Sequence, residues 1–265
     1  MSGGSRGIGL AIALRAAQDG ANVALLAKTG VSHPTLEGTI HTAVDKIRSA
    51  GGRALAIVGD VRNETDVDAA VAQTVSQFGG IDIVVNNASA IDLSTTTNLP
   101  MKKYDLMQDI NTRGAFLLAK TALPHLSESN SAQILSLSPP LNLNPYWAGV
   151  HLGYTISKYG MSLVTLGLAA ELADHHIGVN SLWPRTTIAT AAVDNILGGP
   201  DMLARSRTPA IMADAAHIIL TRDPQRCTGN FFIDDEVLAE EGIDDLSPYG
   251  GPADELEIDI FLGTR

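Results

Sequence analysis

The feature that most constrains this 265-residue sequence is a glycine-rich turn that opens directly into an amphipathic helix. Ser2 to Gly9 reads Ser-Gly-Gly-Ser-Arg-Gly-Ile-Gly, and apolar residues follow at once in Leu10–Leu14. Glycines let a backbone approach a pyrophosphate closely, and a helix N-terminus offers free N–H groups with a partial positive charge. An ordinary tight turn can also contain a glycine cluster. Because an apolar strand, Val23–Ala27, follows at the spacing of a β-α-β unit, we interpret the turn as a dinucleotide site.

Beyond this turn, apolar runs of strand length alternate with helical stretches, which is typical of a parallel sheet covered by helices on both faces. The expected strands are Val23–Ala27, Ala54–Val58, Ile83–Val85, Ile134–Ser138, Val179–Trp183 and Phe231–Ile233. The expected helices are Leu10–Asp19, Thr39–Ala50, Glu64–Phe78, Tyr104–Leu126, Tyr154–His175 and Ala213–Leu220. We therefore predict an α/β fold: a single Rossmann-type doubly wound domain over residues 1–265, with a central parallel sheet flanked by helices on both faces.

The two ends of the chain depart from that plan. A strand should precede the glycine turn, yet only Met1 stands there, so we expect the first strand to be missing or truncated in this numbering. Apolar residues added upstream should then raise the melting temperature. The stretch from 234 to 265 is acid-rich, and we expect an irregular acidic tail lying over the surface. Residues 189–207 are expected to form a mobile substrate lid.

Charge and composition narrow the classes of partner. The formal charge of −11 disfavours nucleic acid and anionic lipid, since Lys and Arg are scattered along the chain. No apolar run is long enough to cross a bilayer, and the C-terminus lacks a peroxisomal tripeptide, so we expect no membrane insertion and a cytoplasmic location. The single cysteine, Cys227, has no metal-ligand neighbours at useful spacing, and we expect no metal site.

The end of the strand after the glycine turn indicates which dinucleotide fits. An acidic residue there would bind a ribose 2′-hydroxyl, whereas this chain has Ala27-Lys28-Thr29, with a second cation, Arg6, in the turn. Two cations favour a 2′-phosphate and hence NADP(H), although both could be solvated surface charges. Asp60-Val61 is placed to meet the adenine. Asn86-Asn87-Ala88-Ser89 is placed near the ribose, unless the two asparagines form a simple turn.

A second constellation is Tyr154-Thr155-Ile156-Ser157-Lys158 at the start of an expected helix. The i,i+4 spacing places the phenol and the ammonium on one face. A cation within about 4–6 Å favours the phenolate and makes a tyrosine usable as an acid or base near neutral pH. Such a pair also occurs by chance on many helices. Its position after the glycine turn, in this order, favours a catalytic role.

Together, Gly3-x-x-x-Gly7-x-Gly9, Asn86-Asn87-Ala88, Asn111 and Tyr154-x-x-x-Lys158 resemble the short-chain dehydrogenase/reductase family over nearly the whole chain. The resemblance implies that Tyr154 is the proton donor and that Lys158 lowers its pKa and binds the ribose. It also implies that Asn111 maintains a water chain, although a helix residue bonded to backbone is the plainer interpretation of Asn111. The implied cofactor contacts are Gly3, Ser5, Arg6, Gly7, Ile8, Gly9, Lys28, Asp60, Val61, Asn87, Ala88, Ser89, Tyr154, Lys158, Pro184, Thr187 and Ile188.

The sequence departs from the family where the substrate carbonyl is polarised. The family usually has paired serines about thirteen positions before the tyrosine, whereas here Pro139 takes the second place and Ser138 lies sixteen positions before Tyr154. Ser138 can still serve if the proline-rich loop bulges. Otherwise Ser138 only caps the strand, and Asn142, Asn144 or no residue polarises the carbonyl.

Further segments, among them Asn111-Thr112-Arg113-Gly114 and Ser138 to Pro145, resemble one group within the family whose members commonly carry a sterol-carrier domain after the reductase. We expect no such domain in this chain. The resemblance implies an NADP(H)-dependent oxidoreductase that interconverts a carbonyl and an alcohol on an apolar substrate, such as a fatty-acyl, steroid-like or other lipid carbonyl. It also implies a homodimer or homotetramer built on residues 104–126 and 154–175. Two alternatives stay open: a non-catalytic NADP(H)-binding regulatory or scaffolding module, and an enoyl reductase.

Overall fold

The computed structural model describes residues 1–31, 38–251 and 255–263, apart from the side chains of residues 196 and 197. Its sheet consists of β1 (Asn22–Ala27), β2 (Arg53–Val58), β3 (Ile83–Asn86), β4 (Gln133–Ser136), β5 (Gly178–Trp183) and β6 (Phe231–Ile233). β1 pairs with β2, and β3, β4, β5 and β6 pair in that order, every pair being parallel. All six strands overlap the predicted ranges; β6 matches its range, and the other five differ by one or two residues at an end. The predicted parallel sheet is confirmed.

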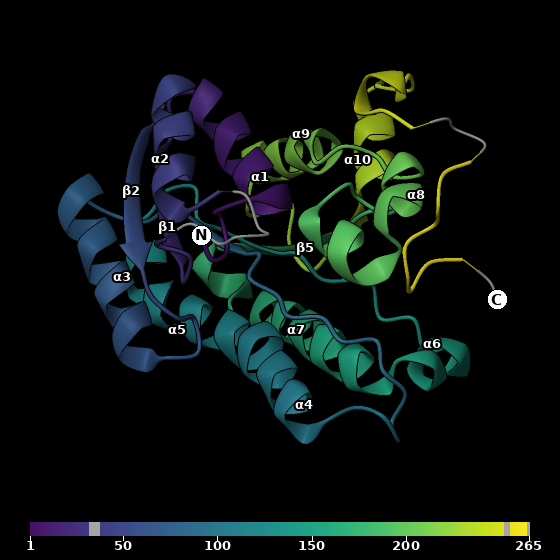
Figure 1. The fold of residues 1–265 in the computed structure, drawn as a ribbon. Helices are drawn as coiled ribbons and strands as arrows, with labels where there is room; N and C mark the ends of the chain where they lie inside the picture. Colours follow the sequence, from purple (N-terminus) through teal and green to yellow (C-terminus); the bar gives the residue numbers. More distant parts are fainter. Residues whose placement is uncertain (32–37, 252–254, 264–265) are drawn as a thin grey trace.

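Helices cover both faces of the sheet (Figure 1). One layer contains α1 (Gly7–Gln18), α2 (Ile40–Ser49), α9 (Ala210–Thr221) and α10 (Asp234–Glu240). The other contains α3 (Glu64–Phe78), α4 (Met101–Met107), α5 (Gly114–Leu126) and α7 (Leu152–Glu171). Two shorter helices, α6 (Pro145–Val150) and α8 (Gly199–Ala204), were not predicted. Within the described residues, no helix combines the length and the apolarity needed to span a bilayer.

Local sequence signals explain where several helices begin and end. Thr39 forms a capping box with Thr42 at the start of α2, and Asn63 accepts a hydrogen bond from Thr65 N at the start of α3. Gly79 ends α3 with φ of 92°, a backbone conformation that costs glycine little. These caps account for the close agreement of the predicted α2 and α3.

The place of the missing central strand is visible between β1 and β3. Ser2 forms parallel bridges to both Leu26 and Asn86, so residues 1 and 2 occupy one end of a strand position in the middle of the sheet. Beyond them lies a cavity of about 640 Å³, lined by Ala24 of β1, Val85 of β3, the residues around them and the helices on either side. The cavity therefore lies between β1 and β3, next to the strand position that residues 1 and 2 occupy.

The predicted irregular surface tail is wrong in two places. Asp234–Glu240 forms α10, whose Val237 and Leu238 are fully buried against α9. Near the end of the chain, Phe261 and Leu262 are also buried. The prediction depended on the acidic composition of this stretch and did not account for a few apolar residues that pack in the core. Residues 252–254 and 264–265 of the expected tail lie outside the described residues.

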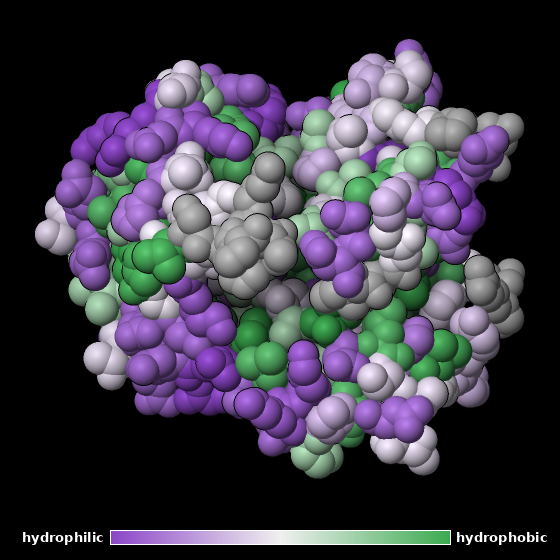
Figure 2. All heavy atoms as spheres, viewed as in Figure 1, coloured by the Kyte–Doolittle hydropathy of each residue, from purple (hydrophilic) through white to green (hydrophobic). Residues whose placement is uncertain are grey.

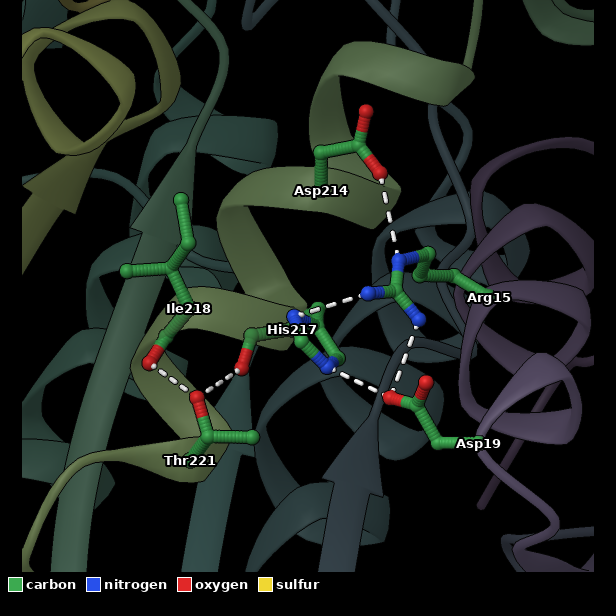
Figure 3. Close-up of polar contacts among 6 residues, drawn as sticks. All are labelled: Arg15, Asp19, Asp214, His217, Ile218 and Thr221. Atoms are coloured by element: carbon green, nitrogen blue, oxygen red, sulfur yellow. Dashed lines mark hydrogen bonds and ion pairs between the residues drawn. The ribbon is translucent and has the colours of Figure 1, made fainter. Parts of the chain in front are cut away.

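Polar contacts join α1 to α9 on the far side of the sheet from α7 (Figure 3). Arg15 donates to Asp19 at 3.0 Å and pairs with Asp214 at 3.5 Å, and its Nη2 lies 3.3 Å from Nδ1 of His217. His217 Nε2 lies 2.6 Å from Asp19 Oδ2. This arrangement suits a neutral imidazole that accepts from Arg15 and donates to Asp19. The network holds the helix that follows the glycine turn against the helix that follows the predicted lid.

Candidate active site

The glycine turn packs tightly against the loop that follows β3. A Cβ on Gly3 would lie 2.8 Å from Ala88 Cα, and one on Gly9 would lie 2.5 Å from Asn87 Nδ2. Asn87 Nδ2 donates to the carbonyls of Ser2 and Gly3 at 3.1 and 2.8 Å. Asn87 therefore fixes the turn through backbone contacts.

The helix behind the turn starts earlier than predicted, at Gly7, so α1 begins inside the glycine cluster. Its N-cap, Arg6, makes no side-chain capping bond, and its first turn holds no acidic residue. Gly7 has φ of 56°, and Ser5 is buried. Free N–H groups without a carboxylate beside them are suited to an anion, so the residues present fit a dinucleotide pyrophosphate at this point.

The predicted cations border the loop between β1 and α2. Arg6 Nη2 donates to the carbonyl of Gly38 at 2.9 Å, and Lys28 Nζ lies 3.6 Å from Asp60 Oδ2. Asp60 is held more tightly by Arg62, at 2.6 Å, and this hydrogen bond is the main cause that lowers the pKa of Asp60. Lys28 is half exposed and makes only this long ion pair with the described residues, so its ammonium is available to a ligand. Val61 is buried against Gly114.

Tyr154 and Lys158 lie on the first turns of α7 and are both buried, at 5% and 2% exposure. Lys158 Nζ donates to the carbonyl of Leu137 at 2.6 Å and lies 5.0 Å above the ring of Trp183. Burial lowers the pKa of Lys158 to about 7. Burial also raises the pKa of Tyr154, the charge of Asp259 raises it further, and a hydrogen bond with Ser89 lowers it. We expected Lys158 to lower the pKa of Tyr154. In the structure the pKa of Tyr154 is raised instead, because the effect of burial is the largest.

Asn111 lies at the centre of a π-helical turn, Gln108–Arg113, that divides the predicted helix of residues 104–126 into α4 and α5. Its side chain is fully buried, accepts from Ala90 N at 2.7 Å and donates to Ala90 O at 2.9 Å. Asn111 Nδ2 also lies 2.9 Å from Ser157 Oγ on α7. Single π turns within α-helices often mark functional sites. The structure thus places Asn111 as a residue that bonds to the backbone of the loop after β3 and contacts α7.

Ser138 lies just after β4 and is completely buried. Its hydroxyl has no hydrogen-bond partner among the described residues, and such a buried polar atom is costly unless a ligand or water satisfies it. The alternative donors have other partners: Asn142 Nδ2 donates to Phe261 O at 3.1 Å, and Asn144 Oδ1 accepts from Tyr146 N at the start of α6. Of the three candidate donors, Ser138 is the one whose hydroxyl, without a partner among the described residues, can bond to a ligand.

The predicted nicotinamide contacts follow β5. Pro184, Thr187 and Ile188 are buried, and Thr187 Oγ1 lies 2.7 Å from Ser206 Oγ. Ile188 forms a parallel bridge with Arg207, which joins the two ends of the predicted lid. Between them the chain is helical, as a π turn at Val193–Leu197 and α8, and Thr190 reaches to 3.3 Å from the Cβ position of Gly7. The segment therefore lies beside the glycine turn.

Sequence analysis missed the residues that cover Tyr154. Phe261 stacks on the ring of Tyr154, with centroids 6.2 Å apart and an interplanar angle of 23°. The ring of Phe261 is in turn surrounded by three aromatic residues, whose ring centroids lie 5.2 to 6.1 Å from its own: Trp147, Tyr159 and Trp183. The signal for Phe261 in the sequence was a short apolar run, Ile260-Phe261-Leu262, within an acidic stretch. It did not indicate a position in the site.

Comparison with known proteins decides the family. The model of the family described as short chain dehydrogenase matches residues 1–198. The chain belongs to the short-chain dehydrogenase family.

This short-chain dehydrogenase is 55% identical to hydroxysteroid dehydrogenase-like protein 2 of Xenopus tropicalis and 51% identical to that of Homo sapiens, in each case over 99% of the chain. It spans 62% of the length of these relatives. A short chain dehydrogenase from Mycobacterium thermoresistibile, whose structure is solved, is 52% identical over 99% of this chain and 94% of its own, with a TM-score of 0.94. A Xanthomonas campestris protein assigned as a dehydrogenase is 57% identical over 99% and 96%, with a TM-score of 0.96. The predicted family resemblance is confirmed.

Proposed function

We propose that this short-chain dehydrogenase interconverts a carbonyl and an alcohol by hydride transfer with NADP(H). The observation that carries the proposal is the burial of a phenol and an ammonium, Tyr154 and Lys158, one turn apart on α7. Lys158 donates to the carbonyl of Leu137, which precedes Ser138, and the Ser138 hydroxyl has no partner among the described residues. A proton donor, a cation and a free hydroxyl are the groups that carbonyl reduction needs from the protein.

Each side chain has a role that follows from its place. The bound dinucleotide supplies or accepts the hydride. Tyr154 gives its hydroxyl proton to the carbonyl oxygen during reduction and takes it back during oxidation. Ser138 donates a hydrogen bond to the same oxygen, and Lys158 stabilises the phenolate that forms. Asn111 holds Ala90 and Ser157, so it positions Tyr154 relative to the loop after β3.

The choice of NADP(H) rests on Lys28 and Arg6. Both cations border the loop after β1, where a 2′-phosphate on the adenosine ribose would lie; among the described residues Arg6 pairs with no carboxylate and Lys28 makes only a long ion pair of 3.6 Å with Asp60. The nearest acidic group, Asp60, is already engaged by Arg62. An apolar substrate is favoured because Phe261 stacks on Tyr154, and both belong to an apolar cluster that also contains Trp147 and Trp183. Figure 2 shows further apolar residues near α6 and the start of α7, where Leu143 and Leu152 are exposed.

A homodimer or homotetramer is proposed on the outer faces of α5 and α7. Phe116 is 50% exposed, and Leu163 and Leu166, which share a face of α7, are 56% and 45% exposed. A hollow of about 390 Å³ lies beside Phe116 and Val164. Apolar side chains in this number on two adjacent helices indicate an interface. The cytoplasmic location stays a prediction.

The test is NADPH oxidation across a panel of aldehydes, ketones and enoyl thioesters. We expect turnover on aldehydes or ketones, and we expect Tyr154→Phe to lower it by about 10²–10⁴-fold while NADPH affinity stays within about twofold, because the ring and its packing remain. Tyr159→Phe is the matched control, since it keeps the ring and removes only a hydroxyl that donates to Asn142 O. Full activity in Tyr154→Phe contradicts the mechanism. Activity on enoyl thioesters alone would indicate an enoyl reductase, and tight NADPH binding without any turnover would indicate a binding module.

A further inference from the structure

The last described segment, residues 255–263, crosses the candidate active site and is named here the C-terminal strap. Figure 1 shows it as the yellow trace that passes α8. On one side it pairs with the residues after β5: Ile258 bridges Thr186, Thr187 N donates to Glu257 O at 2.9 Å, and Asp259 N donates to Arg185 O at 3.0 Å. On this side the strap is attached through backbone hydrogen bonds and through Arg205, which donates to Glu255 O and pairs with Glu257. Water can replace such exposed polar contacts at small net cost.

On its other side the strap reaches the loop after β4. Trp183 Nε1 donates to Ile260 O at 3.0 Å, and Asn142 Nδ2 donates to Phe261 O at 3.1 Å. Phe261 has φ of 73°, a left-handed conformation that costs a non-glycine residue about 1–2 kcal/mol. Strain of this kind persists only where surrounding contacts hold it, and it is often found at ligand clamps. Here the contacts are the rings around Phe261.

The position of Phe261 conflicts with the access that catalysis needs. A substrate carbonyl must come within hydrogen-bond distance of the Tyr154 hydroxyl, yet Tyr154 is 5% exposed and its ring lies against Phe261. The charge of half-buried Asp259 in the same strap also raises the pKa of Tyr154 and so opposes formation of the phenolate. The seated strap therefore disfavours the reaction both sterically and electrostatically.

We propose that the C-terminal strap gates the catalytic pocket and that Phe261 sets how large a group beside the reacting carbonyl can reach Tyr154. This inference rests on the proposed carbonyl reduction. Seated, the strap fills the pocket with its phenyl ring. When the strap lifts, the ring leaves a space walled by Trp147, Tyr159 and Trp183, which suits an apolar group.

The first test does not depend on activity. Hydrogen–deuterium exchange of the full chain should show peptides from residues 255–263 exchanging at least tenfold faster than peptides from β5, because a gate must open while the sheet stays closed. Adding 1-dodecanol together with NADP+ should change exchange in the strap and leave β2 unchanged. Strap protection equal to that of β5 would overturn the gate and leave a fixed wall.

The second test compares substrates of different size. Phe261→Ala should raise kcat/KM for dodecanal relative to propanal at least fivefold, and Phe261→Leu should give a smaller rise. Ile258→Ala is the matched control, because Ile258 lies on the same strap and is 47% exposed. The ratio of kcat/KM for dodecanal to that for propanal should equal that of the wild type in this variant. A merely structural role of Phe261 would change both aldehydes alike, and an unchanged ratio in both Phe261 variants overturns the proposal. If the wild type turned over no carbonyl, the proposed function would fail, whereas the exchange measurement would still report on strap opening.

Discussion

Asn111 Nδ2 lies 2.9 Å from Ser157 Oγ, and this contact joins the π-helical turn before α5 to the turn of α7 that lies between Tyr154 and Lys158. Ser157 Oγ in turn donates to Tyr154 O at 2.8 Å. The backbone that carries the phenol is therefore held, through Ser157, by a residue that lies 46 positions before Ser157 in the chain.

Asn111→Ala is expected to lower both stability and turnover. The variant leaves the N–H and C=O of Ala90 without their partner, at a cost of about 1–3 kcal/mol for each buried group. Thermal melting measures the first effect, and steady-state kinetics should show kcat falling more than KM rises. Ser157→Ala, which removes only the contact to α7, should cost less stability and still lower kcat. Unchanged kcat in both variants contradicts the positioning role.

Lys28→Ala is expected to weaken NADPH binding by about 10–100-fold, since a charge-assisted hydrogen bond contributes about 1.5–3 kcal/mol. NADH affinity should stay within about twofold, because NADH lacks the 2′-phosphate. Titration calorimetry with both dinucleotides measures the difference. Lys46→Ala, at an exposed lysine in the last turn of α2, is the control and should bind both as the wild type does. Equal loss for NADPH and NADH would show that Lys28 does not select the phosphate.

Asp234→Asn is expected to stabilise the protein more at pH 8 than at pH 5. Asp234 is fully buried, and burial raises its pKa from 3.8 to about 7, with Asp235 raising it further and Arg185 opposing. Between these two values the folded state holds a proton that the unfolded chain has released, so stability falls as the pH rises from about 4 to about 7. Asparagine has no proton to lose. Melting temperatures at both pH values, with exposed Asp244→Asn as control, measure the effect; a gain confined to pH 5 would contradict it.

Filling the cavity between β1 and β3 is expected to stabilise the fold. Five apolar, β-branched residues added before Met1 can extend the strand position that residues 1 and 2 begin, and each 1 kcal/mol gained should raise the melting temperature by roughly 2–4 °C. A glycine-serine extension of equal length should leave it unchanged. Equal melting temperatures for the two extensions would show that the cavity does not accept a strand.

Leu163→Lys is expected to dissociate the proposed oligomer, because a buried ammonium at an apolar interface has no partner. Light scattering after size-exclusion chromatography at low micromolar concentration measures the mass. Ile243→Lys, at a comparably apolar exposed site outside α5 and α7, should keep the wild-type mass. A monomeric wild type, or an oligomer unaffected by Leu163→Lys, would remove the proposed interface.

Short-range patterns in the sequence determined the fold class and much of the candidate site. Alternating apolar runs predicted six strands in their observed places, and the glycine turn and the Tyr154–Lys158 spacing predicted which groups share a helix start, because each depends on residues a few positions apart. Only the tertiary structure decided what covers Tyr154. Phe261 contacts Asn142 across 119 positions, and nothing periodic in an acidic stretch indicates such a contact. The π turn at Asn111 was equally hidden, since one extra residue in a helix is stabilised by distant partners, here Ala90 and Ser157, and not by local propensity.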